Sequence, residues 1–279
     1  MSAADHTPPV ESTPQRPRRQ RVQSAVTGMA VLKGLARLGG RASLTALATH
    51  IGESPAKVHR YLVSLIEEGL VGQESGSQQY HLGLEALQIG LAAMRQSDPI
   101  RFAEPSLVRL REQLEVTCFL AVMGNKGPTI VRFEEPGLPV SVNVRVGSVL
   151  SLLWSATGRV MLGSLDDPAV RAQARSELEA AAPDLRAELD ADDPIGGLRS
   201  AVREAGCAVV RDTNLKGISA IAAPVFDHAG RLCAVLTALG ATGGFDPSPD
   251  GPIGLAVCAE ARMVSARLGH DPDRAHGDL

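Results

Sequence analysis

The chain has 279 residues, of which 44% are hydrophobic and 21% are charged, and its formal net charge is −3. This length is enough for two domains that each bury a core. Because the sequence has no run of about 18 apolar residues and no apolar stretch near its start, we expect neither a membrane span nor a secretion signal, and we expect a cytoplasmic protein.

Positive charge is concentrated in the first part of the chain. Up to Leu82 there are nine Lys and Arg residues but only six Asp and Glu residues, although the whole chain is acidic. Residues 1–22 are rich in Pro, Ser, Thr and Arg and are expected to form a disordered basic arm. The four arginines at 16–21 either contact DNA phosphates or a minor groove, or simply keep the arm solvated.

Residues 23–83 have the pattern of a winged helix-turn-helix domain. A first helix is predicted over 24–38, a second after the capping residue Ser43, and a third after the capping residue Ser54. The residues expected in the core recur at helical spacing, as Leu44, Leu47, Ala48 and Ile51 in the second helix and as Val58, Leu62, Leu65 and Ile66 in the third.

A β-hairpin, the wing, is predicted after the third helix, with strands at 70–71 and 79–82 and a polar tip at 74–77. The other face of the third helix carries cations and hydrogen-bond donors, as a helix that enters the major groove of DNA does. The residues assigned to DNA contact are Ser54, Ala56, Lys57, His59, Arg60, Tyr61 and Ser64. Tyr61 and Ser64 are assigned to phosphates. The alternative is an ordinary solvated helical hairpin.

A linker helix is predicted within 84–98. Its apolar residues Leu84, Leu87, Leu91 and Met94 recur at heptad-like intervals. A single short helix is unstable by itself, so it packs either against a second copy of the chain or against its own domain.

A second domain is predicted over 99–272, followed by a disordered tail at 273–279. It is expected to be an α+β domain with helices packed on an antiparallel sheet. Its predicted helices are 101–114, 156–165, 167–181, 198–204 and 252–268, and its predicted strands are 117–123, 129–134, 140–146, 207–211, 220–226 and 232–239.

Neither a metal site nor an active site is apparent in the sequence. The four cysteines, Cys118, Cys207, Cys233 and Cys258, are far apart, so reduced and packed thiols are expected, with no zinc and no cofactor. Asp212 is the best-placed acid, but it has no obvious partner. Catalysis needs a nucleophile with a base, or paired carboxylates, so we do not expect an enzyme.

The chain resembles the IclR family of bacterial transcriptional regulators over nearly all of residues 23–269. The similarity lies in QSAVTGMAVLKGLARLGG, LTALATHIGESPAKVHRYLVSLIEEGLV and YHLGLEALQIG in the first half. In the second half it lies in VGSVLSLLWSATGRVMLG and GCAVVRDTNLKGISAIAAPVFDHAGRLCAVLTALG. The resemblance implies a homodimer or tetramer in which a C-terminal GAF-like effector-binding domain controls binding of the winged helix to double-stranded operator DNA.

The resemblance also implies the position of an effector cavity. One wall corresponds to Ser155, Ala156, Thr157, Gly158 and Arg159, the opposite walls to Val210, Ala220, Thr237 and Leu239, and Asp212 is assigned to the same site. Trp154 either lines the cavity mouth or packs in the core or at an oligomer interface. Some relatives have polar groups at the positions of Val210, Ala220 and Leu239, so a less polar effector is expected here, an aromatic or alicyclic carboxylate. A helix N-terminus suits such an anion.

Three functions are carried forward. The first is a ligand-responsive, sequence-specific transcriptional regulator. The second is a DNA-binding protein whose C-terminal domain serves only for oligomerisation. The third is a catalytic domain tethered to DNA, which turnover of a bound acid would support. Activation and repression are not distinguished, because the same DNA contact can recruit or block polymerase.

Overall fold

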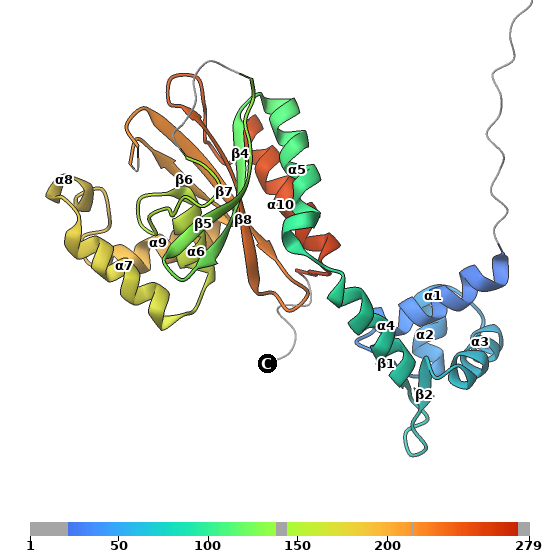
Figure 1. The fold of residues 1–279 in the computed structure, drawn as a ribbon. Coiled ribbons are helices and arrows are strands. Elements are labelled where there is room, and N and C mark those ends of the chain that lie inside the picture. Colours follow the sequence, from blue (N-terminus) through green and yellow to red (C-terminus); the bar gives the residue numbers. More distant parts are fainter. Residues whose placement is uncertain (1–21, 138–143, 214, 273–279) are drawn as a thin grey trace, which may run out of the picture. The chain divides into compact units, whose positions relative to one another are not determined.

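A computed structural model describes residues 22–137, 144–213 and 215–272 of the chain (Figure 1). The chain divides into two compact units, Met1–Gln96 and Ser97–Leu279. Apart from Val22, the predicted basic arm with its four arginines lies outside the described residues, and so does the predicted tail.

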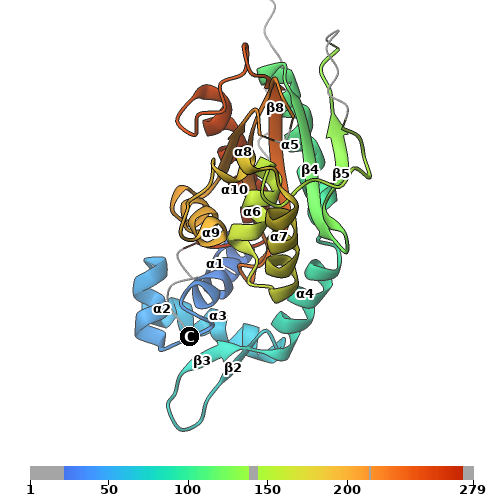
Figure 2. The ribbon, with the colours of Figure 1, turned by 90° about the vertical axis from the view of Figure 1, so that its left-hand side faces the viewer.

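The first unit is a winged helix-turn-helix followed by a further helix. Its elements are α1 (Gln23–Arg37), β1 (Arg41–Ala42), α2 (Leu44–Ile51), α3 (Pro55–Glu67), β2 (Val71–Gln73), β3 (Tyr80–Leu82) and α4 (Leu84–Arg95). The three helices and the wing are confirmed, and the wing projects as a narrow hairpin (Figure 2). The short strand β1 was not predicted. It pairs antiparallel with β3 and completes a small sheet of order β1-β3-β2.

Local capping fixes the turn between α2 and α3. The Ser43 hydroxyl accepts a hydrogen bond from the Ala46 N–H at 3.2 Å, and the Ser54 hydroxyl accepts one from the Lys57 N–H at 3.4 Å. Gly52 ends α2 in the left-handed conformation with φ 71°, which a residue without a Cβ adopts at little cost. Both predicted caps are therefore confirmed.

The core of this unit is formed mainly by α1, α2 and α3. Val58, Leu62 and Leu65 are buried as predicted, but Ile66 is 37% exposed, so that part of the predicted stripe was wrong. Val58, Leu62 and Leu65 follow one face of the helix, and Ile66 falls at its margin near the last turn. These three buried side chains still anchor α3 to the core of the unit.

The helix α4 has no buried residue. Its apolar side chains Leu84, Leu87, Ile89, Leu91 and Met94 are 43–65% exposed. An apolar helix face of this kind is incompletely covered within one chain.

The second unit contains a five-stranded antiparallel sheet of order β5-β4-β8-β7-β6. Its strands are β4 (Thr117–Gly124), β5 (Gly127–Glu134), β6 (Ala208–Arg211), β7 (Ile218–Phe226) and β8 (Leu232–Ala241). Its helices are α5 (Pro99–Leu114), α6 (Ala156–Ser164), α7 (Pro168–Ala180), α8 (Pro183–Arg186), α9 (Pro194–Ala205) and α10 (Pro252–Arg267). The α+β architecture is confirmed.

Two differences from the predicted elements have local causes. The strand predicted at 140–146 is absent at 144–146, where Gly147 adopts φ 90° and the Ser148 side chain accepts a hydrogen bond from the Arg145 N–H at 3.0 Å. This turn overrides the alternating valines, and residues 140–143 lie outside the described part. The helix predicted from Leu198 begins earlier, at Pro194, because the Asp193 side chain caps it.

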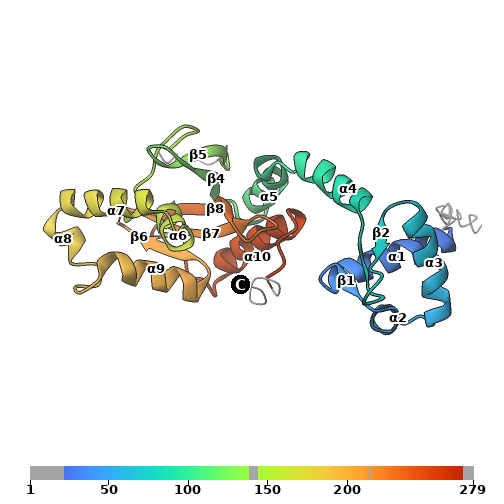
Figure 3. The same cartoon turned by 90° about the horizontal axis from the view of Figure 1, so that it is seen from below.

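Helices cover both faces of the sheet (Figures 1 and 3). The helices α5 and α10 lie on one face, and α6, α7 and α9 lie on the other. Alternate residues of β4 enter the two cores: Phe119 faces the core beneath α6, and Cys118 and Leu120 face the core beneath α10. The sheet is therefore buried on both sides, and the start of α6 lies directly against it.

An ion pair joins the two helices on the α5–α10 face. The Arg109 guanidinium donates to both carboxylate oxygens of Glu260, with Nε–Oε1 at 3.0 Å and Nη2–Oε2 at 2.6 Å. Burial by itself would raise the pKa of Glu260, but the hydrogen bonds from Arg109 and Ser106 outweigh it and lower the pKa. The pair therefore favours an ionised Glu260 in the folded protein.

Candidate DNA interface and ligand cavity

The helix α3 presents most of the residues assigned to DNA contact. Ala56, His59, Arg60 and Ser64 are exposed. Tyr61 is half-buried and packs against the core of its unit, so only part of this side chain reaches the surface. Ser54 acts as the helix cap.

Two of these side chains have partners within the unit. The Lys57 ammonium forms an ion pair with Glu53 at 2.7 Å, four residues earlier. His59 Nδ1 lies 3.3 Å from the Tyr80 hydroxyl, which links α3 to the wing strand β3. These contacts orient both side chains and occupy part of their hydrogen-bonding capacity.

Unlike Lys57 and His59, Arg60 forms no hydrogen bond or ion pair with any residue that the structure describes. Five N–H donors in a rigid planar group are thus available to a phosphate or to the edge of a guanine. Among the residues assigned to α3, Arg60 carries the free cation.

The wing is held in shape by its own polar contacts. Arg41 on β1 pairs with Glu74 at 3.2 Å, and the Ser77 hydroxyl donates to Glu74 at 2.5 Å. The Ser77 hydrogen bond and the Arg41 charge together lower the pKa of Glu74. An ionised carboxylate at the tip of the wing would repel DNA phosphates if it were unpaired, so its ion pair with Arg41 suits a surface that faces DNA.

In the second unit, the predicted effector residues meet around a small cavity of about 40 Å³. Seven of the ten assigned residues line it, namely Ser155, Ala156, Thr157, Val210, Ala220, Thr237 and Leu239. They come from the start of α6 and from the strands β6, β7 and β8. The cavity therefore lies between α6 and the sheet.

The polar groups of this cavity are few. Thr157 Oγ1 and Thr237 Oγ1 are buried and hydrogen-bonded to each other at 2.8 Å. Ser155 caps α6, accepting from the Gly158 N–H at 2.9 Å and donating to the Ser151 carbonyl at 2.6 Å. The N–H groups of Ala156 and Thr157 have no acceptor among the described residues. An anion that reached this point would meet two free N–H groups and two hydroxyls.

Three of the assigned residues do not line the cavity. Trp154 is buried in the core that surrounds it, and its carbonyl accepts a hydrogen bond from the Thr213 hydroxyl at 2.7 Å. Gly158 allows α6 to approach the backbone at Ser151, where a Cβ would overlap the carbonyl oxygen. Asp212 has a structural role, since it accepts from the Gly217 N–H at 2.7 Å and the Thr242 hydroxyl at 3.0 Å.

Sequence reasoning missed five residues that line the cavity: Phe119, Val144, Leu150, Leu215 and Ile218. The alternation of β4 could have identified Phe119 as a residue facing α6. The others come from loops or from a strand end, whose position against the cavity has no local signal in the sequence. All five are apolar, which strengthens the apolar character of the site.

Arg159, the next residue on α6, acts away from the cavity. Its Nε donates to the Leu153 carbonyl at 2.8 Å, and its Nη1 donates to the Val209 carbonyl at 3.2 Å. Burial lowers the pKa of this guanidinium. It braces the loop before α6 against β6 and is not placed to hold an effector.

Other kinds of site have no support in the described part of the chain. No group of three or more His, Cys, Asp and Glu residues there could hold a metal ion, and no helix there is long and apolar enough to cross a membrane. All four cysteines are free thiols, and burial raises the pKa of Cys118 to about 12. That thiol is a poor nucleophile at neutral pH.

Comparisons with known proteins agree with both units. Residues 91–265 match the family model described as the bacterial transcriptional regulator IclR C-terminal domain, and residues 24–75 match the IclR helix-turn-helix domain. The crystal structure of HmgR from Pseudomonas aeruginosa is 39% identical, with a TM-score of 0.82, and the match covers 90% of this chain and 100% of HmgR.

Two further relatives are similar over most of their length. The transcriptional regulator BhcR of Paracoccus denitrificans is 28% identical over 243 residues, which are 85% of this chain and 83% of BhcR. The Pca regulon regulatory protein of Pseudomonas putida is 28% identical over 218 residues, which are 76% of this chain and 72% of that protein.

Proposed function

Because this chain belongs to the IclR family of bacterial transcriptional regulators, we propose that it binds a specific operator in double-stranded DNA and that a small organic carboxylate controls this binding. The observation that carries the proposal is the pairing of two features. An exposed helix α3 carries the free cation Arg60, and a separate unit has a small cavity with buried hydroxyls.

In the DNA contact, α3 enters the major groove. Arg60 reads a base edge, and Ala56, near the helix start, allows a close approach. Lys57 and His59 are held by Glu53 and Tyr80 and contact the groove from fixed positions. Ser64 contacts a phosphate, and Tyr61 does so to the extent that its packing permits. The proposal follows from exposure and donor chemistry.

The effector carboxylate binds at the start of α6. The N–H groups of Ala156 and Thr157 and the Thr157 and Thr237 hydroxyls receive its oxygens. The remaining lining is apolar and contacts an aromatic or alicyclic ring. A drug-sized ligand needs about 300 Å³ or more, so a cavity of about 40 Å³ must open to admit it. Opening couples ligand binding to a change of conformation.

The apolar face of α4 supports a homodimer. Its leucines and Met94 remain exposed in the single chain, and a second copy would cover them. A dimer places two copies of α3 on two half-sites, and a palindromic operator would match this symmetry. We propose this face as the contact between two copies, with a tetramer as the larger alternative.

Fluorescence anisotropy of the purified protein tests the DNA part of the proposal. The DNA upstream of its own gene is compared with a length-matched scrambled duplex across a salt series. Tighter binding to the upstream DNA at every salt concentration supports sequence-specific regulation. Equal and steeply salt-dependent binding to both duplexes contradicts readout of this DNA, because it indicates phosphate contact alone.

The small size of the cavity favours one alternative function, a regulator whose C-terminal unit only oligomerises. The two functions differ in their response to carboxylates. If an aromatic or alicyclic acid binds the folded protein, it raises the melting temperature of the second unit by mass action. No stabilisation across such a series of acids would favour the oligomerisation function.

A further inference from the structure

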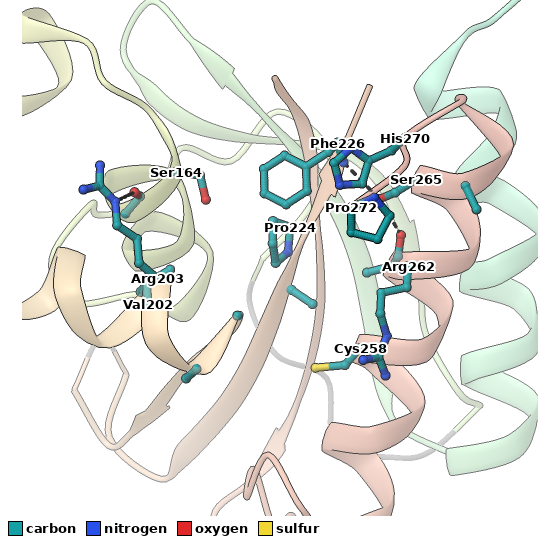
Figure 4. A pocket seen from close by; sticks show the side chains of 16 residues that line it. Ser164, Val202, Arg203, Pro224, Phe226, Cys258, Arg262, Ser265, His270 and Pro272 are labelled. Atoms are coloured by element: carbon teal, nitrogen blue, oxygen red, sulfur yellow. Dashed lines mark hydrogen bonds between the residues drawn. The ribbon is translucent and has the colours of Figure 1, made fainter. Parts of the chain in front are cut away.

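A second and larger recess lies at the edge of the sheet in the C-terminal unit. We call it the edge groove: its floor is the end of β7 with Pro224 and Phe226, one wall is α9 with Val202 and Arg203, and the other wall is α10 with Arg262 (Figure 4). Its volume is about 700 Å³, and it shares no lining residue with the cavity beneath α6.

The edge groove exists because β6 is shorter than its neighbour. β6 pairs with residues 219–222 of β7, so residues 223–226 have no strand on that side. Exposed strand edges usually attract another strand, but this one lacks the donors for pairing. Pro224 has no N–H, and the Phe226 N–H donates to the Ser265 hydroxyl at 3.0 Å. The edge is therefore unsuited to strand addition.

The charged side chains of the groove are all basic. Arg203, Arg262 and His270 line it, and none of the described residues that line it is Asp or Glu, although the chain as a whole is acidic. Arg203 Nε donates to the Gly163 carbonyl at 2.9 Å, which fixes this side chain at one wall. Arg262 forms no ion pair with a described carboxylate. A free guanidinium in a groove without acidic residues attracts an anion.

Apart from Ser164 and Ser265, the rest of the groove is apolar, and it includes a ring platform. The Phe226 and His270 rings lie 5.2 Å apart between centroids, and Pro224 lies next to them (Figure 4). Planar ligand rings pack well on such surfaces. A volume of about 700 Å³ falls within the range of small-molecule sites.

We propose that the edge groove is a second small-molecule site that binds an amphipathic aromatic carboxylate, with the carboxylate on Arg262 and the ring against Pro224 and Phe226. This site is distinct from the effector cavity and is open before any ligand arrives. It does not depend on the proposed DNA contact or on opening of the cavity beneath α6.

The thiol of Cys258 can report whether a ligand occupies the edge groove. It lines the groove on α10, and Figure 4 shows its sulfur beside the Arg262 guanidinium. A hydrogen bond from Cys207, together with the Arg262 charge, lowers the pKa of Cys258. A thiol with a lowered pKa reacts readily with alkylating agents. Cys233 lies outside the groove, and burial raises its pKa to about 11, so it reacts more slowly than Cys258 and serves as an internal control over a longer reaction time.

The test measures alkylation of the full-length chain by iodoacetamide with peptide mass spectrometry, using 1-naphthoate as the probe. We expect the probe to slow alkylation of Cys258 by about threefold at a concentration twice its Kd, and to leave Cys233 unchanged. In Arg262→Gln the protection disappears. In Arg175→Gln, which removes an exposed arginine of α7 outside the groove, protection is retained. Rates with and without probe are compared within each variant, because Arg262 also affects the thiol itself.

Three results would overturn the proposal. The first is no protection by 1-naphthoate. The second is equal protection by the neutral analogue 1-naphthalenemethanol, or protection that survives Arg262→Gln, since the carboxylate would then have no partner. The third is alkylation of Cys258 that slows with rising protein concentration in the absence of acid, which would make the groove an interface between copies of the chain.

Discussion

The two units present their candidate functional groups in opposite ways. On α3 the key cation, Arg60, is exposed and unpaired, and its neighbours are already oriented by Glu53 and Tyr80. Beneath α6 the Thr157 and Thr237 hydroxyls are buried and paired with each other in a cavity of about 40 Å³. The proposed DNA surface is thus ready for its partner, whereas the proposed ligand site has to enlarge.

This difference has an energetic consequence. A preformed surface loses little free energy to reorganisation on binding, so its affinity follows charge and salt. When a ligand must enlarge its cavity, part of the binding free energy is lost to that conformational change. Only the difference between its affinities for the two conformations shifts the equilibrium between them. Regulation in this account depends on the closed state of the second unit.

The largest effect is expected from Gly158→Ala. Its Cβ would overlap the Ser151 carbonyl oxygen, which is backbone and cannot move aside cheaply. We expect the unfolding free energy of the second unit to fall by about 3 kcal/mol or more, while the first unit melts as before. Gly243→Ala, where a Cβ meets nothing within 4 Å, is the control. Thermal denaturation followed by circular dichroism measures both, and an unchanged melt for Gly158→Ala would contradict the close packing.

Arg60→Ala should weaken operator binding by about fivefold to 150-fold, because a side chain that reads a base edge contributes about 1–3 kcal/mol. Lys57→Ala should weaken operator binding less than Arg60→Ala does, since Lys57 is already paired with Glu53. Arg175→Ala on α7 controls for the loss of one positive charge. Anisotropy titrations rank the three variants, and equal affinity for Arg60→Ala and the wild type would remove Arg60 from the contact.

The buried hydroxyl pair can be tested with a double-mutant cycle. Thr157→Val leaves the Thr237 hydroxyl without its partner, at a cost of about 1–3 kcal/mol in the free energy of unfolding. Adding Thr237→Val removes that stranded group, so the double variant should lose less than the sum of the two single variants. Urea denaturation gives the three values. Strict additivity would show that the two hydroxyls do not depend on each other.

The acid sensitivity of the second unit should depend partly on Glu260. Its pKa is lowered in the folded state, so its contribution to stability is present above the unfolded pKa of about 4.3 and is lost as pH falls through the folded value. Below about pH 4.5 the free energy of unfolding falls in the wild type. We expect this fall to be smaller by roughly 1 kcal/mol in Glu260→Gln. Melting curves between neutral and acidic pH measure the slope, and an unaltered slope in the variant would contradict this assignment.

The smallest effect is expected from Glu53→Gln. Breaking the pair at 2.7 Å frees the Lys57 ammonium and removes a negative charge next to α3. The pair is worth only about 0.3–0.5 kcal/mol, so DNA affinity should rise about twofold at low salt, and the gain should fade as salt increases. A gain that persists at high salt would indicate a cause other than charge.

Local signals predicted the parts of the fold that depend on neighbouring residues. Ser43, Ser54 and Gly52 mark helix ends through short-range hydrogen bonds and backbone freedom, and all three function as expected. The two-residue strand β1 was missed because it depends on pairing with β3, far along the chain. The valines at 144 and 146 suggested a strand, but the turn at Gly147 decided the conformation.

The site was predictable only in part for the same reason. The start of α6 and the strand positions were identified through the family resemblance, and seven of these residues line the cavity. Asp212 was assigned to the site, yet it is held by Gly217 and Thr242, contacts that no local pattern reveals. The loop residues Leu150 and Leu215 reach the cavity only through the tertiary fold.

The central claim is tested most directly by measuring operator affinity while aromatic and alicyclic monocarboxylates are added to the wild type and to Thr157→Val/Thr237→Val. The account predicts that at least one acid changes the wild-type Kd by about fivefold or more, a typical coupling free energy of 1 kcal/mol, and that the variant loses this response but still binds DNA. No change with any acid, or an equal response in the variant, would contradict a ligand site at the start of α6.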